Sequence, residues 1–146
     1  MAHSPLDILR GEPNDKRSWR RFNIELTILV EPVSEDEPEP ELRSARSKQR
    51  TALVTDISVN GLFFVSPADY PIDSLVDIQL TLGTQSYSLR GLVVRHEVRE
   101  LPGRSAHGCA VQFVRTESVK MAIPAIANYI LRKTAAGTAT PVQAAA

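Results

Sequence analysis

Residues 56–65 read Asp-Ile-Ser-Val-Asn-Gly-Leu-Phe-Phe-Val, a polar stretch followed at once by an apolar run. The pair Asn60-Gly61 is a strong signal for chain reversal, because both residue types tolerate the backbone conformations that tight turns require. The apolar residues that follow suit a returning strand. The stretch therefore predicts a β-hairpin whose turn carries a carboxylate, a hydroxyl and a glycine.

The sequence on both sides of this hairpin also favours strands, because apolar and polar residues alternate with a period of two. About six strands are expected, near residues 24–30, 52–57, 62–65, 75–82, 87–98 and 108–114. Their connections are mostly of hairpin length. This pattern is typical of an antiparallel barrel or sandwich.

The apolar spacing changes to three and four residues over 117–133, which predicts a C-terminal amphipathic helix. Pro124 interrupts this pattern. Because proline is tolerated in a first helical turn and costs about 3 kcal/mol in a helix interior, we expect the main helix to begin near Ile123, after a separate turn over 117–121.

The 146 residues, of which 42% are hydrophobic, suffice for one compact domain, expected over residues 15–133. The ends, residues 1–14 and 134–146, show little periodicity and are expected to be flexible tails. Residues 34–50 hold five acids and two prolines followed by four bases, which predicts a solvated, charged loop insertion.

Several function classes are disfavoured by composition. The 17 basic residues balance 17 acidic ones, so the chain as a whole offers no polycationic surface to nucleic acid. No apolar run is long enough for membrane insertion, and no secretory leader pattern is seen, which favours a cytoplasmic protein. No nucleophile is paired with a base at a recognisable spacing, so we expect a protein that is not an enzyme.

Cysteine and histidine are scarce, which bears on metals and disulfides. Cys109 is the single cysteine, so the chain cannot form an internal disulfide. The stretch His107-Gly-Cys109 offers too few ligands for a zinc site, since zinc takes three or four from the protein. We therefore expect Cys109 to pack as a small apolar residue, and we expect no metal.

Arginines precede the first strand, in the stretch Arg17-Ser-Trp-Arg-Arg21. A guanidinium group binds phosphate oxygens bidentately and also pairs with the guanine edge at O6 and N7. Asp56 could accept hydrogen bonds from the guanine N1 and N2 donors, and Ser58 could reach a phosphate or a base edge. Together with the close backbone approach that Gly61 allows, these groups indicate a site for a phosphorylated purine.

The two motifs resemble the PilZ family, bacterial receptors for cyclic di-GMP. That family has an Arg-x-x-x-Arg segment, a short strand and an Asp/Asn-x-Ser-x-x-Gly turn. Arg17 and Arg21 match the first motif, and Asp56, Ser58 and Gly61 match the second. The resemblance implies an all-β fold with a C-terminal helix, in which a six-stranded antiparallel β-barrel binds cyclic di-GMP as its ligand, with no other cofactor.

The resemblance extends to three further residues. Arg95 occupies a strand position where the family often places an aromatic residue or an arginine against a guanine. Lys16, just before the first motif arginine, would favour binding of an intercalated ligand pair. Arg20 allows a second register, in which Arg20 or Arg21 aligns with the first motif arginine and Ile24 falls at the second position; that register predicts weak binding or none.

The resemblance implies a receptor that changes conformation on ligand binding and signals to an unidentified protein partner in motility, exopolysaccharide production or regulation. The alternative is a ligand-independent adaptor that keeps the barrel and docks through its charged loop or helix. The motif residues also have ordinary structural interpretations: the arginines as a solvated segment, Asp56 and Ser58 as an ordinary turn, and Arg95 as a strand residue facing water. Whether the chain forms a homodimer stays open.

Overall fold

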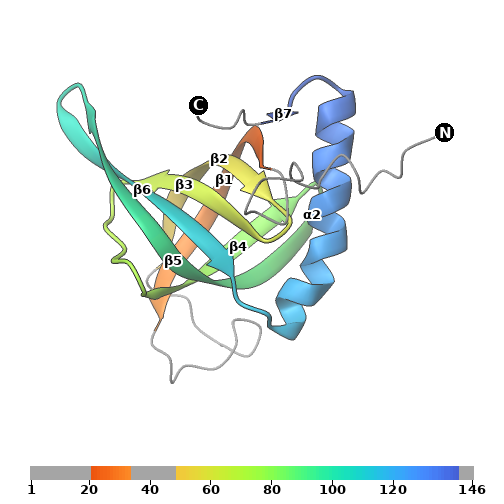
Figure 1. Cartoon of the computed structure of the whole chain (residues 1–146), viewed down its shortest axis with the longest axis horizontal. Coiled ribbons are helices and arrows are strands. Elements are labelled where there is room, and N and C mark those ends of the chain that lie inside the picture. The colour runs from red at the N-terminus through yellow and green to blue at the C-terminus, as the bar shows by residue number, and fades with distance from the viewer. Residues whose placement is uncertain (1–20, 34–48, 142–146) are drawn as a thin grey trace, which may run out of the picture.

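The computed structural model describes residues 21–33 and 49–141, which form a strand-rich body with one long helix beside it (Figure 1). The main elements are β1 Phe22–Val33, β2 Arg50–Ser58, β3 Gly61–Ser66, β4 Leu75–Leu82, β5 Gln85–Leu101, β6 Arg104–Phe113 and α2 Glu117–Ala135. A two-residue strand, β7 Thr140–Pro141, follows the helix. The expected N-terminal tail 1–14 and most of the charged loop 34–50 lie outside the described residues.

The six longer strands close into a ring. Their order is β2-β3-β6-β5-β4-β1, and β1 also pairs with β2, so the first and last strands of the sheet are joined. Every pairing in the ring is antiparallel. Closure removes the unpaired edges that an open sheet would expose. The predicted six-stranded antiparallel barrel is therefore confirmed.

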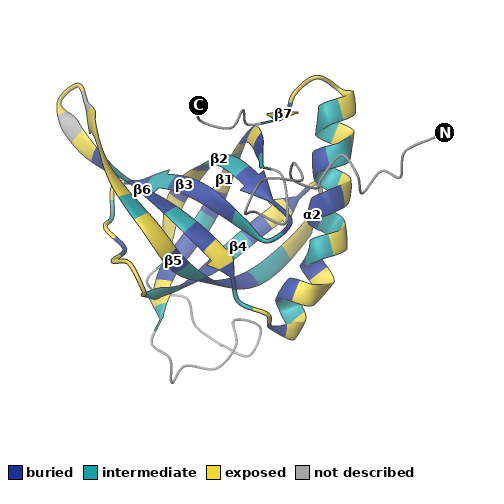
Figure 2. Cartoon of the chain, in the orientation of Figure 1, coloured by how far each residue is buried: buried dark blue, intermediate teal, exposed yellow. Residues whose placement is uncertain are grey.

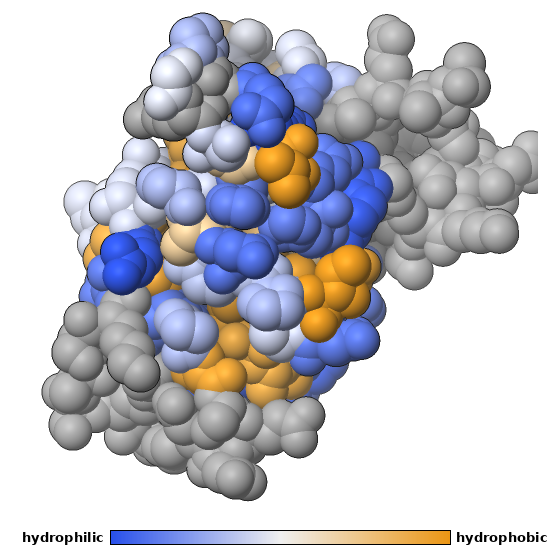
Figure 3. Space-filling model, turned by 90° about the vertical axis from the view of Figure 1, so that its left-hand side faces the viewer, coloured by the Kyte–Doolittle hydropathy of each residue, from blue (hydrophilic) through white to orange (hydrophobic). Residues whose placement is uncertain are grey.

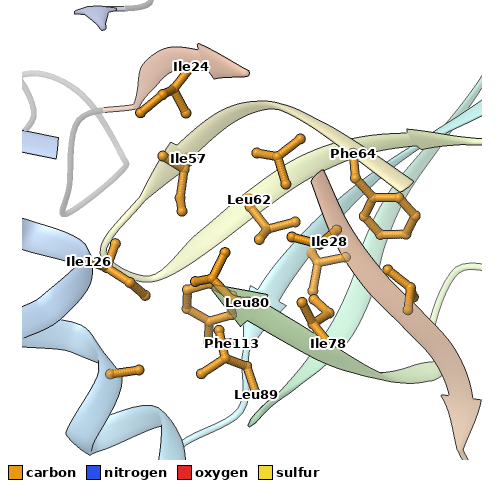
Figure 4. Packing of buried hydrophobic residues seen from close by; sticks show 14 of the residues in the cluster. Ile24, Ile28, Ile57, Leu62, Phe64, Ile78, Leu80, Leu89, Phe113 and Ile126 are labelled. Carbon is orange, nitrogen blue, oxygen red and sulfur yellow. The ribbon is translucent and has the colours of Figure 1, made fainter. Parts of the chain in front are cut away.

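The barrel interior is the hydrophobic core, and alternation along each strand fills it. On β4 the inward residues Val76, Ile78 and Leu80 are fully buried, as the sequence pattern predicts. Side chains from several strands and from Ile126 of α2 meet in one cluster (Figure 4). Figure 2 shows the buried residues interspersed with exposed ones along the ribbons. One continuous core thus supports both the strands and the helix.

The helix α2 is uninterrupted, so the predicted break before Ile123 is wrong. Thr116 caps its first turn by accepting a hydrogen bond from the Val119 backbone N–H at 3.1 Å. Pro124 lies within the helix but on its exposed side, where water can reach the carbonyl that proline leaves without an intrahelical donor. The apolar face of α2 packs on the core through Val119, Ile126 and Ile130, which outweighs the local cost of the proline.

The sequence predicts a flexible tail over 134–146, and this prediction is wrong for residues 134–141. Gly137 has a φ of 77°, a left-handed conformation that suits glycine and turns the chain back after the helix. Ala139 is then buried in the core, and β7 pairs with the start of β1. The segment therefore belongs to the domain.

The two ends of the barrel differ. Helix α2 lies at one end, near the β2–β3 turn, whereas the long β5–β6 hairpin and the β3–β4 connection project at the other end (Figure 1). Within the described residues, no helix has the length and apolarity needed to cross a bilayer. The outer face of the ring between these ends carries Asp56 and Arg95.

Candidate functional site

A row of residues crosses the outer face of the barrel and links the two sequence motifs. The strand registers align Asn23 with Asp56, Asp56 with Phe63, Phe63 with Ala110, and Ala110 with Arg95. Paired residues on antiparallel strands point to the same side of a sheet. Bulges in β2 and β5 set this register, because the pairing shifts between Val54 and Asp56 and again before Arg95. The residues therefore share one surface.

Arg21 and Asp56 meet at the β1–β2 end of this row. The Arg21 Nη1 atom lies 3.3 Å from the Asp56 Oδ1 atom, and the two side chains keep 21% and 14% of their accessible surface. The second arginine of the first motif thus lies beside the carboxylate of the second motif. The contact brings together two groups that are far apart in sequence; the Asp56 Oδ1 atom is covered, while the rest of each side chain keeps some exposure.

Ser58 has a different environment from the one that its proposed ligand role suggests. Its side chain is buried, and its hydroxyl lies 2.6 Å from the Asn60 Oδ1 atom. The Ser58 Oγ atom also accepts a hydrogen bond from the Asn60 backbone N–H at 3.3 Å. These are the bonds of a hydroxyl that stabilises its own turn. Ser58 therefore shapes the loop that carries Asp56, which is the ordinary structural interpretation of this serine.

Gly61 is needed for strand packing. A Cβ atom at this position would lie 2.3 Å from the Val111 carbonyl oxygen on β6, a distance that backbone atoms cannot tolerate. Gly61 does not have a positive φ, and it pairs with Ser58 as the first residue of β3, so the reversal falls on Val59 and Asn60. The predicted hairpin is confirmed with its turn shifted by one residue.

Phe63 forms an aromatic platform in the middle of the row. The guanidinium carbons of Arg95 and Arg99 lie 5.8 Å and 5.1 Å from the centre of its ring, within the range of cation–π attraction. Beneath the ring, a Cβ atom at Gly108 would lie only 2.5 Å from Phe63, so glycine lets the ring lie close to β6. Phe63 is only 2% exposed, so its ring supports the two guanidinium groups, and the planar face that a purine can reach is that of an arginine.

Arg95 lies at the β5 end of the row. Its side chain is 48% exposed, and its Nε atom is 3.7 Å from the Glu97 Oε1 atom. Three strand-to-strand steps of about 4.8 Å separate Arg95 from Asp56, which places them roughly 14 Å apart. The two residues would therefore contact different parts of a ligand. Lys16, Arg17 and Arg20 lie outside the described residues.

A second arginine–carboxylate pair on the outer face was not predicted from sequence. The Arg90 Nε and Nη2 atoms donate to the two Asp77 carboxylate oxygens at 2.9 Å and 3.2 Å. Both side chains are buried, at 8% and 0% exposure. Alternation along β4 and β5 marks both positions as polar, but only the strand register shows that they face each other.

Cys109 packs inside the barrel, as predicted. It is fully buried, and its thiol lies 3.8 Å from the Tyr70 carbonyl oxygen. Burial raises the pKa of the Cys109 thiol to about 11, so the group is protonated at neutral pH. It is therefore a core residue without nucleophilic character.

Comparisons with known proteins agree with this architecture. The sequence matches the PilZ domain family over residues 15–123, and a search of curated proteins finds no match. The structure resembles the Bacillus subtilis inhibitor of motility MotI/DgrA, with a TM-score of 0.61 and 12% identity over 84% of this chain and 53% of that one.

Two further solved structures have similar scores. The PilZ domain of YcgR from Escherichia coli, described with c-di-GMP, has a TM-score of 0.60 and 10% identity over 84% of this chain and 97% of that domain. MrkH of K. pneumonia has a TM-score of 0.60 and 13% identity over 87% of this chain and 54% of MrkH. This chain thus spans about half the length of MotI and MrkH.

At these identities the structural likeness shows a shared fold. The family match adds the sequence motifs, because its range includes both the arginine segment and the Asp56–Gly61 turn. The match also covers well over half of the chain. The chain belongs to the PilZ family.

Proposed function

We propose that this chain is a receptor for cyclic di-GMP, which binds on the outer face of the barrel along the row from Asp56 to Arg95. The observation that carries the proposal is the contact between Arg21 and Asp56, with 3.3 Å between the two charged groups. It joins the two motifs at an accessible place. The PilZ family membership supports this ligand class.

The chemistry of the pair suits a guanine nucleotide. A carboxylate has several lone-pair positions, so Asp56 can stay beside Arg21 and still accept hydrogen bonds from guanine N1 and N2. Arg21 can then direct its guanidinium to a phosphate oxygen or to guanine O6 and N7. The contact orients both side chains before the ligand arrives, which lowers the entropy lost on binding.

The other end of the row supplies a planar cation. Arg95 is 48% exposed and lies over the buried Phe63 ring, which holds the guanidinium in place. A base placed here would stack on the guanidinium. Because this end lies roughly 14 Å from Asp56 by strand spacing, one extended dinucleotide or a ligand pair could occupy the whole row.

The segment before β1 completes the proposed site. Arg17 and Lys16 precede Arg21 by four and five positions, so they can reach the same ligand from the N-terminal side. We expect this segment to lie over the barrel face when the ligand is bound. The resulting change of surface is the signal that a protein partner reads. The role of Arg20 is then to add positive charge to the segment.

The proposed partner is a protein and not DNA, because the chain carries no net charge. A related fold occurs in MrkH, which is described as a c-di-GMP-dependent transcription regulatory factor, but this chain covers only about half of that protein. DNA binding with a steep salt dependence would contradict the assignment of a protein partner.

Isothermal titration calorimetry with cyclic di-GMP tests the proposed receptor directly. Arg21→Ala and Asp56→Ala should each weaken binding by roughly 10- to 100-fold, because each removes charge-assisted hydrogen bonds worth about 1.5–3 kcal/mol. Arg132→Ala, a cation at the end of α2, is the matched control and should bind like the wild type. If the intact chain gives no binding heat while it is folded, the ligand-independent adaptor is the better description.

A further inference from the structure

Two histidines face inward at the end of the barrel that lies opposite α2. His96 pairs with Cys109 in the sheet register, and His107 lies two residues before Cys109 on the same strand. Since Cys109 points into the core, both histidines share its side of the sheet. Here the β5–β6 hairpin extends past the core, so the inward side faces the β3–β4 connection (Figure 1).

Asp69, from that connection, lies beside the two rings. Its Oδ1 atom is 3.0 Å from the His96 Nε2 atom, and this nitrogen is 3.1 Å from the His107 Nδ1 atom. One potential ligand atom from each residue falls within 4.8 Å of the other two. Three lone-pair donors from three separate chain segments therefore converge on one point.

The connection that carries Asp69 is anchored on both sides. The next residue, Tyr70, is buried and packs edge-on against Phe64 in the core. On the other side, the Ala68 backbone N–H donates to the Ser66 Oγ atom at 3.0 Å. The backbone at Asp69 is thus held in place, while its side chain is 59% exposed and can turn toward a ligand.

We propose that Asp69, His96 and His107 form a binding site for a divalent transition-metal ion of the zinc class. Zinc bonds to histidine nitrogen and carboxylate oxygen at about 2.0–2.2 Å, which places neighbouring ligand atoms of a tetrahedral site about 3.3 Å apart. The Asp69–His96 and His96–His107 separations of 3.0 Å and 3.1 Å are close to this value. A rotation of the exposed Asp69 carboxylate brings in the third ligand, and a water molecule fills the fourth position.

Hydrogen bonding alone satisfies this cluster poorly. A neutral imidazole has one N–H, and the His96 Nε2 atom faces both a carboxylate oxygen and a second imidazole nitrogen. One proton on that atom would have to serve two acceptors at once. A divalent cation instead accepts a lone pair from each of the three groups, so it fits the arrangement better.

The ligand set also selects the kind of metal. Two imidazoles and one carboxylate suit zinc, cobalt, nickel or copper, whereas magnesium and calcium prefer oxygen ligands alone. The thiol of Cys109 lies 3.8 Å from the Tyr70 carbonyl oxygen and is not among the three converging groups. The site would join the β3–β4 connection to the β5–β6 hairpin and so stiffen this end of the barrel.

This site is separate from the proposed nucleotide site. His96 and Arg95 are neighbours on β5, but the sheet alternation directs them to opposite faces. The metal site therefore does not depend on whether cyclic di-GMP binds. Arg21→Ala should leave metal affinity unchanged, which makes the two proposals separable by experiment.

Titration of the full, chelator-treated chain with ZnCl2 tests the metal site. We expect one equivalent of zinc to bind per chain and to raise the melting temperature, because a ligand that binds only the folded state stabilises it. CoCl2 should give the visible absorption bands of tetrahedral cobalt. Excess MgCl2 should not compete with zinc.

Substitutions identify the ligands. His96→Ala, His107→Ala and Asp69→Asn should each weaken zinc binding at least tenfold, whereas His3→Ala, which removes the third histidine of the chain, should not. Asp69→Asn changes an exposed side chain, so it remains informative if a histidine variant folds poorly. Absence of zinc binding by the wild type, or wild-type affinity in Asp69→Asn and a folded histidine variant, would overturn the proposal.

Discussion

Two arginine–carboxylate pairs lie on the outside of the same barrel, and they differ in burial and geometry. Asp77 and Arg90 form a bidentate ion pair that is nearly inaccessible, with side chains 0% and 8% exposed. Arg21 and Asp56 lie 3.3 Å apart at the Nη1 and Oδ1 atoms and keep 21% and 14% exposure. The first pair is closed to a ligand, whereas the second remains within its reach.

The difference in burial separates an ion pair with a structural role from one that can bind a ligand. A buried charge must keep its partner, because an uncompensated ion in a dry environment costs several kcal/mol. A partly exposed pair contributes little to folding, since water and salt screen it. The less buried Arg21–Asp56 pair can therefore bind a ligand without a large cost to stability.

Figure 3 shows another side of the molecule, where hydrophobic patches are separated by hydrophilic surface.

The largest expected effect comes from breaking the buried pair. Arg90→Ala leaves the Asp77 carboxylate without its bidentate partner and should lower the free energy of unfolding by about 3–5 kcal/mol. Urea denaturation measures this loss. Cyclic di-GMP should still bind to the fraction that remains folded. A loss below about 1 kcal/mol would contradict the structural role of this pair.

A smaller loss is expected beneath the Asp56 turn. Gly61→Ala places a methyl group against the Val111 carbonyl oxygen, so β3 must move away from β6. Overpacking of this kind costs typically 1–3 kcal/mol. The displaced turn should also weaken ligand binding. Gly83→Ala is a contrasting variant: its Cβ position is open but its φ of 65° strains an alanine, so it should lose stability through the backbone and keep its ligand affinity. Wild-type stability and affinity in Gly61→Ala would contradict this account.

The less buried pair should matter less for folding. Arg21→Ala should change the free energy of unfolding by less than about 1 kcal/mol, because a partly exposed ion pair contributes in that range. Thermal and urea unfolding check this directly. A loss of unfolding free energy as large as that of Arg90→Ala would mean that both ion pairs have a structural role.

Alkaline pH tests how the buried residues Cys109 and Tyr70 affect the stability of the core. Burial raises the pKa of Cys109 from 9.0 to about 11, so between these values the folded chain holds a proton that the unfolded chain has lost. Stability should be constant below pH 9 and fall as the pH rises toward 11, with Tyr70 adding to the fall because burial raises its pKa too. In Cys109→Val the decline should be shallower. An unchanged decline would assign it to other groups.

The fold could be predicted largely from local patterns. Alternation along Leu75–Leu82 identified which residues enter the core, because a strand has one fixed side-chain period. The hairpin at Asn60 was equally local, although the turn residues shifted by one position. Helix α2 shows the limit of such rules. Pro124 predicted a break, but packing of the helix on the barrel and exposure of the proline overrode the local preference.

The candidate sites also differ in how far the sequence alone predicts them. Asp56 and Arg21 could be named in advance because each belongs to a short motif. The Asp77–Arg90 pair and the Asp69–His96–His107 cluster could not, since their members come together only through strand register and through the β3–β4 connection. Three isolated residues with no fixed spacing carry no signal in a single sequence. The composition therefore predicts no metal, whereas the fold brings together three residues that could ligate one.

The most direct test compares cyclic di-GMP binding to the wild-type chain and to Arg21→Ala by calorimetry at a temperature where both are fully folded. We expect clear binding by the wild type and a loss of roughly 10- to 100-fold in the variant, with unfolding curves that nearly coincide. Equal affinity in the two proteins, or no binding by the folded wild type, would contradict the central claim that the Arg21–Asp56 pair is the ligand-binding pair.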